Sequence, residues 1–156
     1  MQQPAPEPLY RERLWPSLAV VLPTVLVIPA SLLVFLPINI AVGWITAVVF
    51  FVGINTLLIA TAPVIMVDRT HLTAGRARLP LELAGTPTGF TGVDATAQRG
   101  PQLDARAWLV IRGWIGPVVK VPVTDESDPA PYWLISTRRP AAVADAIATA
   151  KTAGSR

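Results

Sequence analysis

The sequence predicts a membrane α-helical hairpin of two transmembrane helices, followed by a small α+β domain. We expect that domain to be an antiparallel β meander or partial barrel with one C-terminal helix. Three observations predict this class. No Asp, Glu, Lys, Arg or His occurs in the 54 residues from Leu14 to Val67. A Pro-Ile-Asn sequence at 37–39 divides this run into two halves. From residue 68 onward, short apolar runs alternate with Gly, Pro and Asp.

The length of the apolar run favours two spans over one. As a single helix it would extend roughly 80 Å, more than twice a ~30 Å hydrocarbon core. We therefore divide segment 14–67 into spans at 14–36 and 40–62. Pro37 ends the first helix, and Asn39 is a suitable N-cap for the second.

The basic residues predict the orientation of the hairpin. Arg11 and Arg13 precede the first span, Arg69 follows the second, and the connecting turn carries no charge. The positive-inside rule then predicts a multi-pass protein of the plasma membrane with both termini in the cytoplasm. Cleavage as a secretory signal is the competing interpretation, but the apolar run is far longer than the 7–15 residues of such signals. Residues 1–13, with three prolines, are expected to form a flexible tail.

Asn55 is the polar residue of interest within the spans. Pro23 leaves the carbonyl of Ala19 without its helical donor, and folding the hairpin about Ile38 brings Asn55 to that depth. The sequence therefore predicts an interhelical hydrogen bond from the Asn55 amide. An oligomer contact, or a substrate or ion site, remains the alternative.

The remaining segment, 68–156, is expected to form a cytosolic β-rich domain. The first predicted hairpin pairs 67–72 with 76–83 across Thr73-Ala74-Gly75. Further strands are expected near 90–95, 107–112, 118–124 and 132–137. Pro140 opens a predicted helix over 140–152, in which Val143, Ile147 and Ala150 share one face.

Two resemblances support this architecture. A β meander closed by a C-terminal helix resembles bacterial pleckstrin-homology-like domains. The sequences Tyr10-Arg11-Glu12-Arg13-Leu14-Trp15-Pro16 and Pro131-Tyr132-Trp133-Leu134-Ile135-Ser136-Thr137-Arg138-Arg139-Pro140, with the two-span run and Pro80, resemble a family of small actinobacterial membrane proteins, domain of unknown function 3093. The similarity covers about residues 9–150. It implies two spans and a cytosolic domain, and it implies no activity.

The sequence offers little catalytic chemistry. There is no Cys, and His71 is the only histidine, so a typical zinc site has too few ligands. The acidic residues Asp125, Glu126 and Asp128 lack the EF-hand pattern. We therefore expect no enzyme activity, no catalytic residue, no cofactor-binding residue and no metal site. The net charge of +3 is too small to favour nucleic-acid binding.

Arg138 and Arg139 are the best candidates for a binding role. They directly precede the predicted helix at 140–152, and free backbone N–H groups at a helix N-terminus favour anions. Two guanidinium groups there could contact a phosphate or a lipid headgroup. The alternative is that they are solvated, or that they pair with Asp145 or Glu126.

These features predict a non-enzymatic, membrane-anchored interaction or scaffold module. The expected partners are the lipid bilayer and a protein partner or a second copy of the chain. One alternative is a domain that binds anionic lipid headgroups through Arg138 and Arg139. Another is an accessory subunit of an envelope enzyme or transporter.

Overall fold

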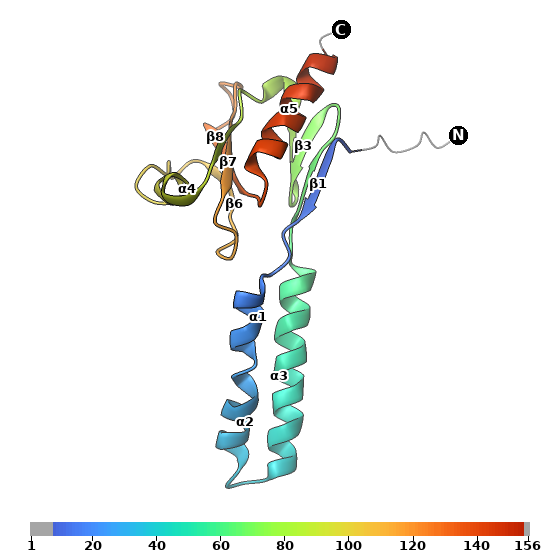
Figure 1. Ribbon diagram of the computed structural model, residues 1–156, viewed down its shortest axis with the longest axis vertical. Helices are drawn as coiled ribbons and strands as arrows, with labels where there is room; N and C mark the ends of the chain where they lie inside the picture. Colours follow the sequence, from blue (N-terminus) through green and yellow to red (C-terminus); the bar gives the residue numbers. More distant parts are fainter. Residues whose placement is uncertain (1–7, 155–156) are drawn as a thin grey trace, which may run out of the picture. The chain divides into compact units, whose positions relative to one another are not determined.

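The computed structural model describes residues 8–154 and contains two compact units (Figure 1). One unit is a helical hairpin, Trp15–Ala62. The other is an α+β domain, formed by the described residues up to Leu14 and from Pro63 onward. The predicted class is confirmed at this level, because apolar helices form a hairpin and β-sheets with a C-terminal helix follow it.

The hairpin unit contains three helices. The first limb consists of α1 (Leu18–Thr24) and α2 (Val27–Phe35), and the second limb is α3 (Ile40–Ala60). By length and composition, Leu18–Phe35 and Ile40–Ala60 can each cross a membrane. The first limb begins later than the predicted span 14–36, since Leu14 belongs to the α+β domain and α1 starts at Leu18. The second limb begins at the first residue of the predicted span 40–62 and ends at Ala60.

Proline explains the break in the first limb. Pro29 has no N–H to donate to the carbonyl of Val25, four residues earlier. That carbonyl accepts a hydrogen bond from the backbone N of Ile28 at 3.0 Å instead, which tightens the helix locally. The start of α3 is the predicted one, because Asn39 Oδ1 accepts from the backbone N of Ala41 at 2.9 Å.

A small residue brings the two limbs together. Gly43 of α3 is buried against α2, and a Cβ atom at this position would lie 3.3 Å from Leu32 Cδ2 and 3.4 Å from Phe35 Cβ. A larger side chain would therefore push the helices apart. This close approach is the packing expected of small residues between apolar helices.

The N-terminal segment is more ordered than predicted. Tyr10–Arg13 forms strand β1, which pairs antiparallel with β2 (Val64–Val67), so a flexible tail over 1–13 is wrong for these residues. The backbone N of Leu14 also donates to the carbonyl of Pro63 at 2.9 Å. Residues 1–7 of the predicted tail lie outside the described residues. The helical hairpin is thus inserted between two neighbouring strands of one sheet.

The first sheet has the strand order β1-β2-β3-β4, with β3 at His71–Ala74 and β4 at Ala77–Pro80. The predicted strand over 67–72 is wrong, because a turn at 68–70 separates β2 from β3. The predicted turn at 73–75 is displaced: Ala74 pairs with Ala77. Gly75 therefore opens the turn, with a φ of +64° that favours glycine.

The second sheet differs from the predicted antiparallel meander. Its order is β5-β7-β8-β6, with β6 running parallel to β8. Its strands are β5 (Thr88–Phe90), β6 (Trp108–Val110), β7 (Val118–Pro122) and β8 (Tyr132–Ser136). A parallel pair needs a crossover, which the chain between β6 and β8 supplies by way of β7.

A helix replaces one predicted strand. α4 (Gly92–Arg99) occupies most of the segment 90–95 that was expected to be extended. It buries Ala95 and Gln98, three residues apart, which is a helical spacing. Phe90 remains at the end of β5 and packs against the cluster that includes Ala95.

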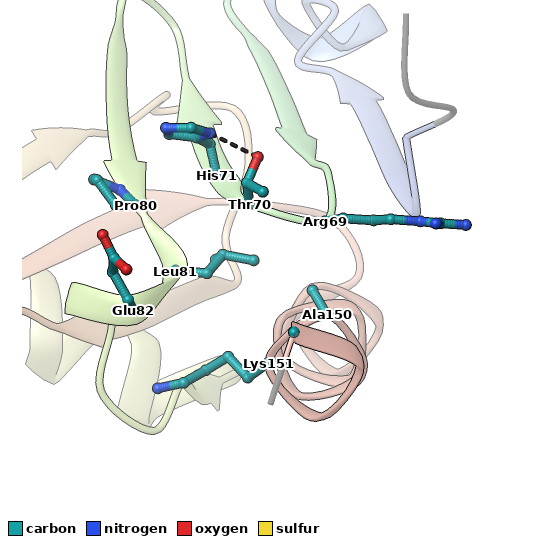
Figure 2. Close-up of a pocket in the computed structure, with 9 residues that line it drawn as sticks. Arg69, Thr70, His71, Pro80, Leu81, Glu82, Ala150 and Lys151 are labelled. Carbon is teal, nitrogen blue, oxygen red and sulfur yellow. Dashed lines mark hydrogen bonds between the residues drawn. The ribbon is translucent and has the colours of Figure 1, made fainter. Parts of the chain in front are cut away.

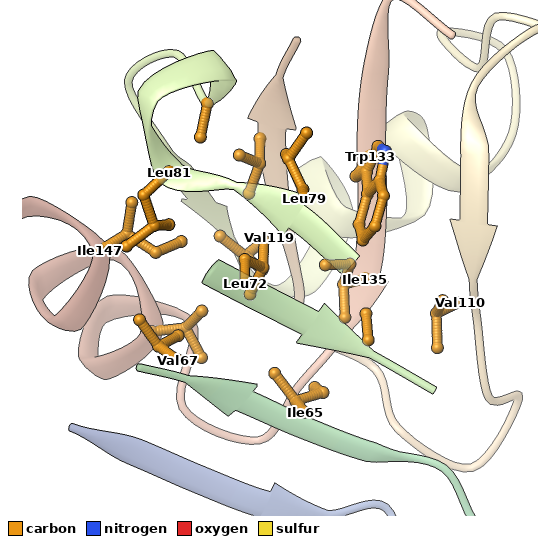
Figure 3. Close-up of a cluster of buried hydrophobic side chains, with 14 of the residues drawn as sticks. Ile65, Val67, Leu72, Leu79, Leu81, Val110, Val119, Trp133, Ile135 and Ile147 are labelled. Carbon is orange, nitrogen blue, oxygen red and sulfur yellow. The ribbon is translucent and has the colours of Figure 1, made fainter. Parts of the chain in front are cut away.

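One apolar core joins the two sheets and the C-terminal helix. A short 3₁₀ helix, η1 (Leu81–Leu83), follows β4, and α5 (Pro140–Gly154) closes the domain. The core includes side chains from the first sheet, the second sheet and α5 (Figure 3), among them Ile65, Leu72, Val119, Ile135 and Ile147. Val143, Ile147 and Ala150 are all buried, which confirms the predicted face of the last helix.

Candidate functional site

The described residues enclose a pocket of about 540 Å³ at the end of the first sheet (Figure 2). Three segments line it: the turn before β3, the end of β4 with η1, and the C-terminal turns of α5. The lining residues are Arg69, Thr70, His71, Pro80, Leu81, Glu82, Ala150, Lys151 and Gly154. No local sequence pattern predicts this pocket, because its walls come from segments about 70 residues apart.

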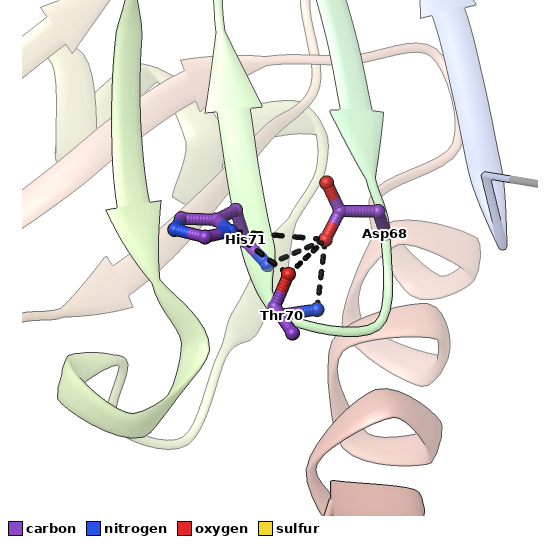
Figure 4. A network of polar contacts seen from close by, with 3 residues as sticks. All are labelled: Asp68, Thr70 and His71. Carbon is purple, nitrogen blue, oxygen red and sulfur yellow. Dashed lines mark hydrogen bonds and ion pairs between the residues drawn. The ribbon is translucent and has the colours of Figure 1, made fainter. Parts of the chain in front are cut away.

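The turn that forms one wall is held by Asp68 (Figure 4). Asp68 Oδ1 accepts hydrogen bonds from the backbone N of Thr70 and of His71, both at 2.7 Å, and from Thr70 Oγ1 at 3.0 Å. His71 Nδ1 lies 2.9 Å from Thr70 Oγ1 and 4.0 Å from Asp68 Oδ1. The Asp68 carboxylate therefore fixes the conformation of the turn that leads into β3.

The hydrogen bonds also decide the acidity of Asp68. Partial burial alone would raise the pKa of its carboxyl group. The backbone N–H groups of Thr70 and His71 and the Thr70 hydroxyl favour the ionised form and outweigh burial, so the pKa lies below its ordinary value. Asp68 is consequently a carboxylate at neutral pH.

We expect Asp68→Ala to destabilise the domain by about 1–2 kcal/mol at neutral pH, because two backbone donors lose their acceptor. Asp68→Asn should cost less, since an amide oxygen still accepts at the same place. The lowered pKa stabilises the folded state fully above the unfolded value of about 4. This contribution is lost as the pH falls through the folded pKa.

Urea unfolding of the full chain at several pH values measures these effects. The stability difference between the natural chain and Asp68→Asn should shrink in acid. A difference that stays constant down to the lowest pH would contradict the assigned direction of the pKa.

Lys151 and Arg69 contribute differently to the pocket. Lys151 Nζ donates to the carbonyl of Ala84, so its ammonium group ties α5 to the chain that follows η1. Figure 2 shows the Arg69 side chain extending away from Leu81 and Glu82. The remaining wall is largely apolar, and Glu82 adds a carboxylate. Over residues 8–154, no group of three or more His, Asp or Glu residues could hold a metal ion.

The structure places Arg138 and Arg139 directly before α5, as predicted, and gives Arg138 a partner that the sequence did not suggest. Glu12 of β1 lies there: its Oε1 accepts from the backbone N of Arg138 at 3.0 Å and lies 3.6 Å from Arg138 Nη1. The carboxylate that the structure places against Arg138 is therefore that of Glu12. A carboxylate of the chain itself thus lies beside the residue pair that precedes α5.

Three neighbours complete the Glu12 network. Thr137 Oγ1 and Tyr10 Oη both donate to Glu12 Oε2, at 2.5 and 2.8 Å, and the backbone N of Arg139 donates to Thr137 Oγ1 at 3.1 Å. Burial is the main cause that raises the pKa of Tyr10, and the Glu12 carboxylate adds to it. The network joins the first strand of the domain to the start of its last helix.

Asn55 bonds to the first limb, but not to the predicted group. Its Nδ2 donates to Thr24 Oγ1 at 3.0 Å and to the carbonyl of Phe51 at 2.8 Å. Thr24 Oγ1 in turn donates to the carbonyl of Val21 at 2.6 Å. The Ala19 carbonyl is therefore the wrong partner: the prediction considered only a carbonyl freed by proline and overlooked a nearby hydroxyl.

We expect Asn55→Leu to destabilise the helical hairpin by about 0.6–2 kcal/mol, the range for interhelical hydrogen bonds in membranes. Thr24→Val should cost a similar amount. The double variant should cost less than the sum, because each single change already breaks the same bond. A double-mutant cycle on unfolding in detergent or bilayer measures this difference. Strictly additive effects would mean that the two side chains do not interact.

The fold and its pocket define a class of protein: an α+β domain with an apolar helical hairpin inserted between its first two strands. The chain belongs to the family described as Protein of unknown function (DUF3093), whose model matches residues 9–147. The match begins just before β1 and ends within α5, so it includes the hairpin and nearly all of the domain. No curated protein and no solved structure matches the chain. The resemblance to pleckstrin-homology-like domains therefore stays a prediction.

Proposed function

We propose that this protein is a membrane-anchored, non-enzymatic interaction module. In this proposal its two apolar limbs cross the plasma membrane, and its α+β domain stands at the cytoplasmic surface and binds a protein partner. The observation that carries the proposal is the pairing of β1 with β2, because it ties both ends of the hairpin to one folded domain.

The exposed surface of the hairpin supports insertion. Only 6% of the first candidate span and 11% of the second are buried within the protein. Leu18, Leu33 and Ile38 have exposed fractions of 85%, 76% and 76%. Contact of so many apolar side chains with water would be strongly unfavourable, whereas hydrocarbon covers them at no such cost.

Strand pairing also restricts the topology. Residues 10–13 and 64–67 form hydrogen-bonded strands, so they must lie on the same side of any membrane that the hairpin crosses. A hairpin with two spans satisfies this condition, and a single span does not. The charge-free turn and the basic residues near both flanks favour the cytoplasmic side for the domain.

Reporter fusions at Gln3 and at Ser155 test the topology. We expect both fusions to report the cytoplasm, since the two flanks of the hairpin belong to one domain. A fusion at Ile38, in the turn, should report the opposite side. A Ser155 fusion that is active only outside the cytoplasm would overturn the orientation. Opposite locations for Gln3 and Ser155 would overturn the two-span anchor.

Purification of the full chain in mild detergent, after cross-linking in cells, tests the interaction role. A protein partner recovered with the natural chain should be lost when residues of the pocket wall are changed, for example in Arg69→Ala or Glu82→Ala. If every purification recovers the same envelope enzyme or transporter, this protein would instead be an accessory subunit of that complex. Cross-links only between copies of the chain would identify a homo-oligomer.

A further inference from the structure

The outer face of the first sheet carries a concentration of arginines. The strand register places Arg11 opposite Met66, and Thr73 opposite both Met66 and Arg78, so these four residues form one row across the sheet. Directly opposed residues project to the same face. The neighbouring row, Tyr10-Val67-Leu72-Leu79, belongs to the other face, where Val67, Leu72 and Leu79 are core residues. The arginine row therefore faces away from the core.

Two more arginines extend this surface. Arg13 shares the face of Arg11, two residues along β1, and Arg76 lies in the turn between β3 and β4. We call Arg11, Arg13, Arg76 and Arg78 the basic face. Arg11, Arg76 and Arg78 are exposed.

The four strands place no carboxylate on the face that carries Arg11, Arg76 and Arg78. Glu12 is the only acidic residue of these strands, and it belongs to the opposite face. Its two oxygens bind Thr137, Tyr10 and Arg138. The basic face thus carries four positive charges, whereas the net charge of the whole chain is +3.

The basic face lies at the end of the sheet from which the hairpin departs. The chain leaves at Leu14 and returns at Pro63, and the backbone N of Gly75, next to Arg76, donates to the carbonyl of Val64 at 2.9 Å. Arg11 precedes Leu14 by three residues, roughly 10 Å along a strand. The Debye length at physiological ionic strength is about 8 Å, so a charged surface at Leu14 would lie near the limit of electrostatic range from Arg11.

We propose that the basic face binds the anionic phospholipid headgroups of the leaflet at which the hairpin ends. The proposal rests on the membrane anchoring proposed above and names a lipid surface as the partner of this face. Arginine suits the role, because its guanidinium group forms two parallel hydrogen bonds with a phosphate. The hairpin keeps the domain near the bilayer, so a modest attraction per arginine is sufficient to hold it there.

A fluorescent probe attached to the full chain tests the proposal. The chain has no cysteine, so His71→Cys provides a single labelling site on the same face, at the far end of β3 from the hairpin. The labelled chain is reconstituted into vesicles of phosphatidylcholine, with or without phosphatidylglycerol, that carry nitroxide-labelled headgroups. We expect stronger quenching of the probe with phosphatidylglycerol, and a loss of this difference at high salt.

Two matched triple variants identify the residues responsible. Arg11→Gln with Arg76→Gln and Arg78→Gln should lower the ratio of bound to unbound domain by about two orders of magnitude. The control triple removes the same charge from other exposed positions outside the pocket wall, Arg106→Gln, Arg138→Gln and Arg139→Gln. We expect the control to quench like the parent. An equal loss in the control would overturn the proposal and favour a general charge effect or the headgroup contact predicted at Arg138 and Arg139.

Resistance to alkaline extraction separates this proposal from the anchoring on which it rests. A chain extracted from the vesicles would overturn both. A chain that is retained, but whose quenching is the same in the two lipid mixtures, would overturn only the binding of headgroups by the basic face.

Discussion

Glu12→Ala is expected to destabilise the α+β domain by about 3 kcal/mol. The Glu12 carboxylate has a side chain only 13% exposed and accepts hydrogen bonds from Tyr10, Thr137 and the backbone of Arg138. Hydrogen bonds to a charged group are worth about 1.5–3 kcal/mol each, and Thr137, which is fully buried, would lose its acceptor. Urea unfolding of the full chain in mild detergent, followed by tryptophan fluorescence, measures the change.

Two variants make this result specific. Glu12→Gln keeps an acceptor oxygen but loses the charge. Its free energy of unfolding should therefore lie between those of the natural chain and Glu12→Ala. Glu82→Ala removes an exposed carboxylate of the same domain and should change the stability by no more than about 0.5 kcal/mol. Equal effects of Glu12→Ala and Glu82→Ala would mean that the Glu12 network does not hold β1 to α5.

Ile147→Ala is expected to cost about 2–5 kcal/mol, the range for removing a large aliphatic side chain from a packed core. Ile147 has no exposed surface and belongs to the cluster that joins α5 to both sheets (Figure 3). The loss combines the transfer of buried methyl groups with the cavity that remains.

Thr149→Ala on the exposed side of α5 is the control and should cost little, because alanine is a good helix former. The same unfolding experiment applies to both variants. If Ile147→Ala unfolded at the same urea concentration as Thr149→Ala, α5 would not be packed as described.

The Arg138 site shows how far the sequence could be interpreted. A basic dipeptide before a helix predicts that an anion is favourable there. The carboxylate that contacts Arg138, that of Glu12, lies 126 residues earlier in the chain. Neither charge nor spacing identifies a partner at that separation, so only the fold could supply it. The pocket beside Asp68 was missed for the same reason, since its walls meet only after α5 packs.

Features that depend on neighbouring residues could be predicted from the sequence. The charge-free run set the two limbs of the hairpin, Asn39 set the start of α3, and the spacing of Val143, Ile147 and Ala150 set the buried face of α5. Hydropathy, capping and helical periodicity act within one or two turns of the chain, so they can be recognised locally.

Only the fold sets the pairing of strands that lie far apart in the chain. It placed Tyr10–Arg13 in a sheet with strands that follow the hairpin, and it set β6 parallel to β8. A strand forms its backbone hydrogen bonds with a partner strand that can lie anywhere in the chain. The residues of the strand itself indicate only which of its two faces is apolar. The insertion of the hairpin between β1 and β2 is therefore a property of the fold, and it ties both ends of the apolar hairpin to one domain.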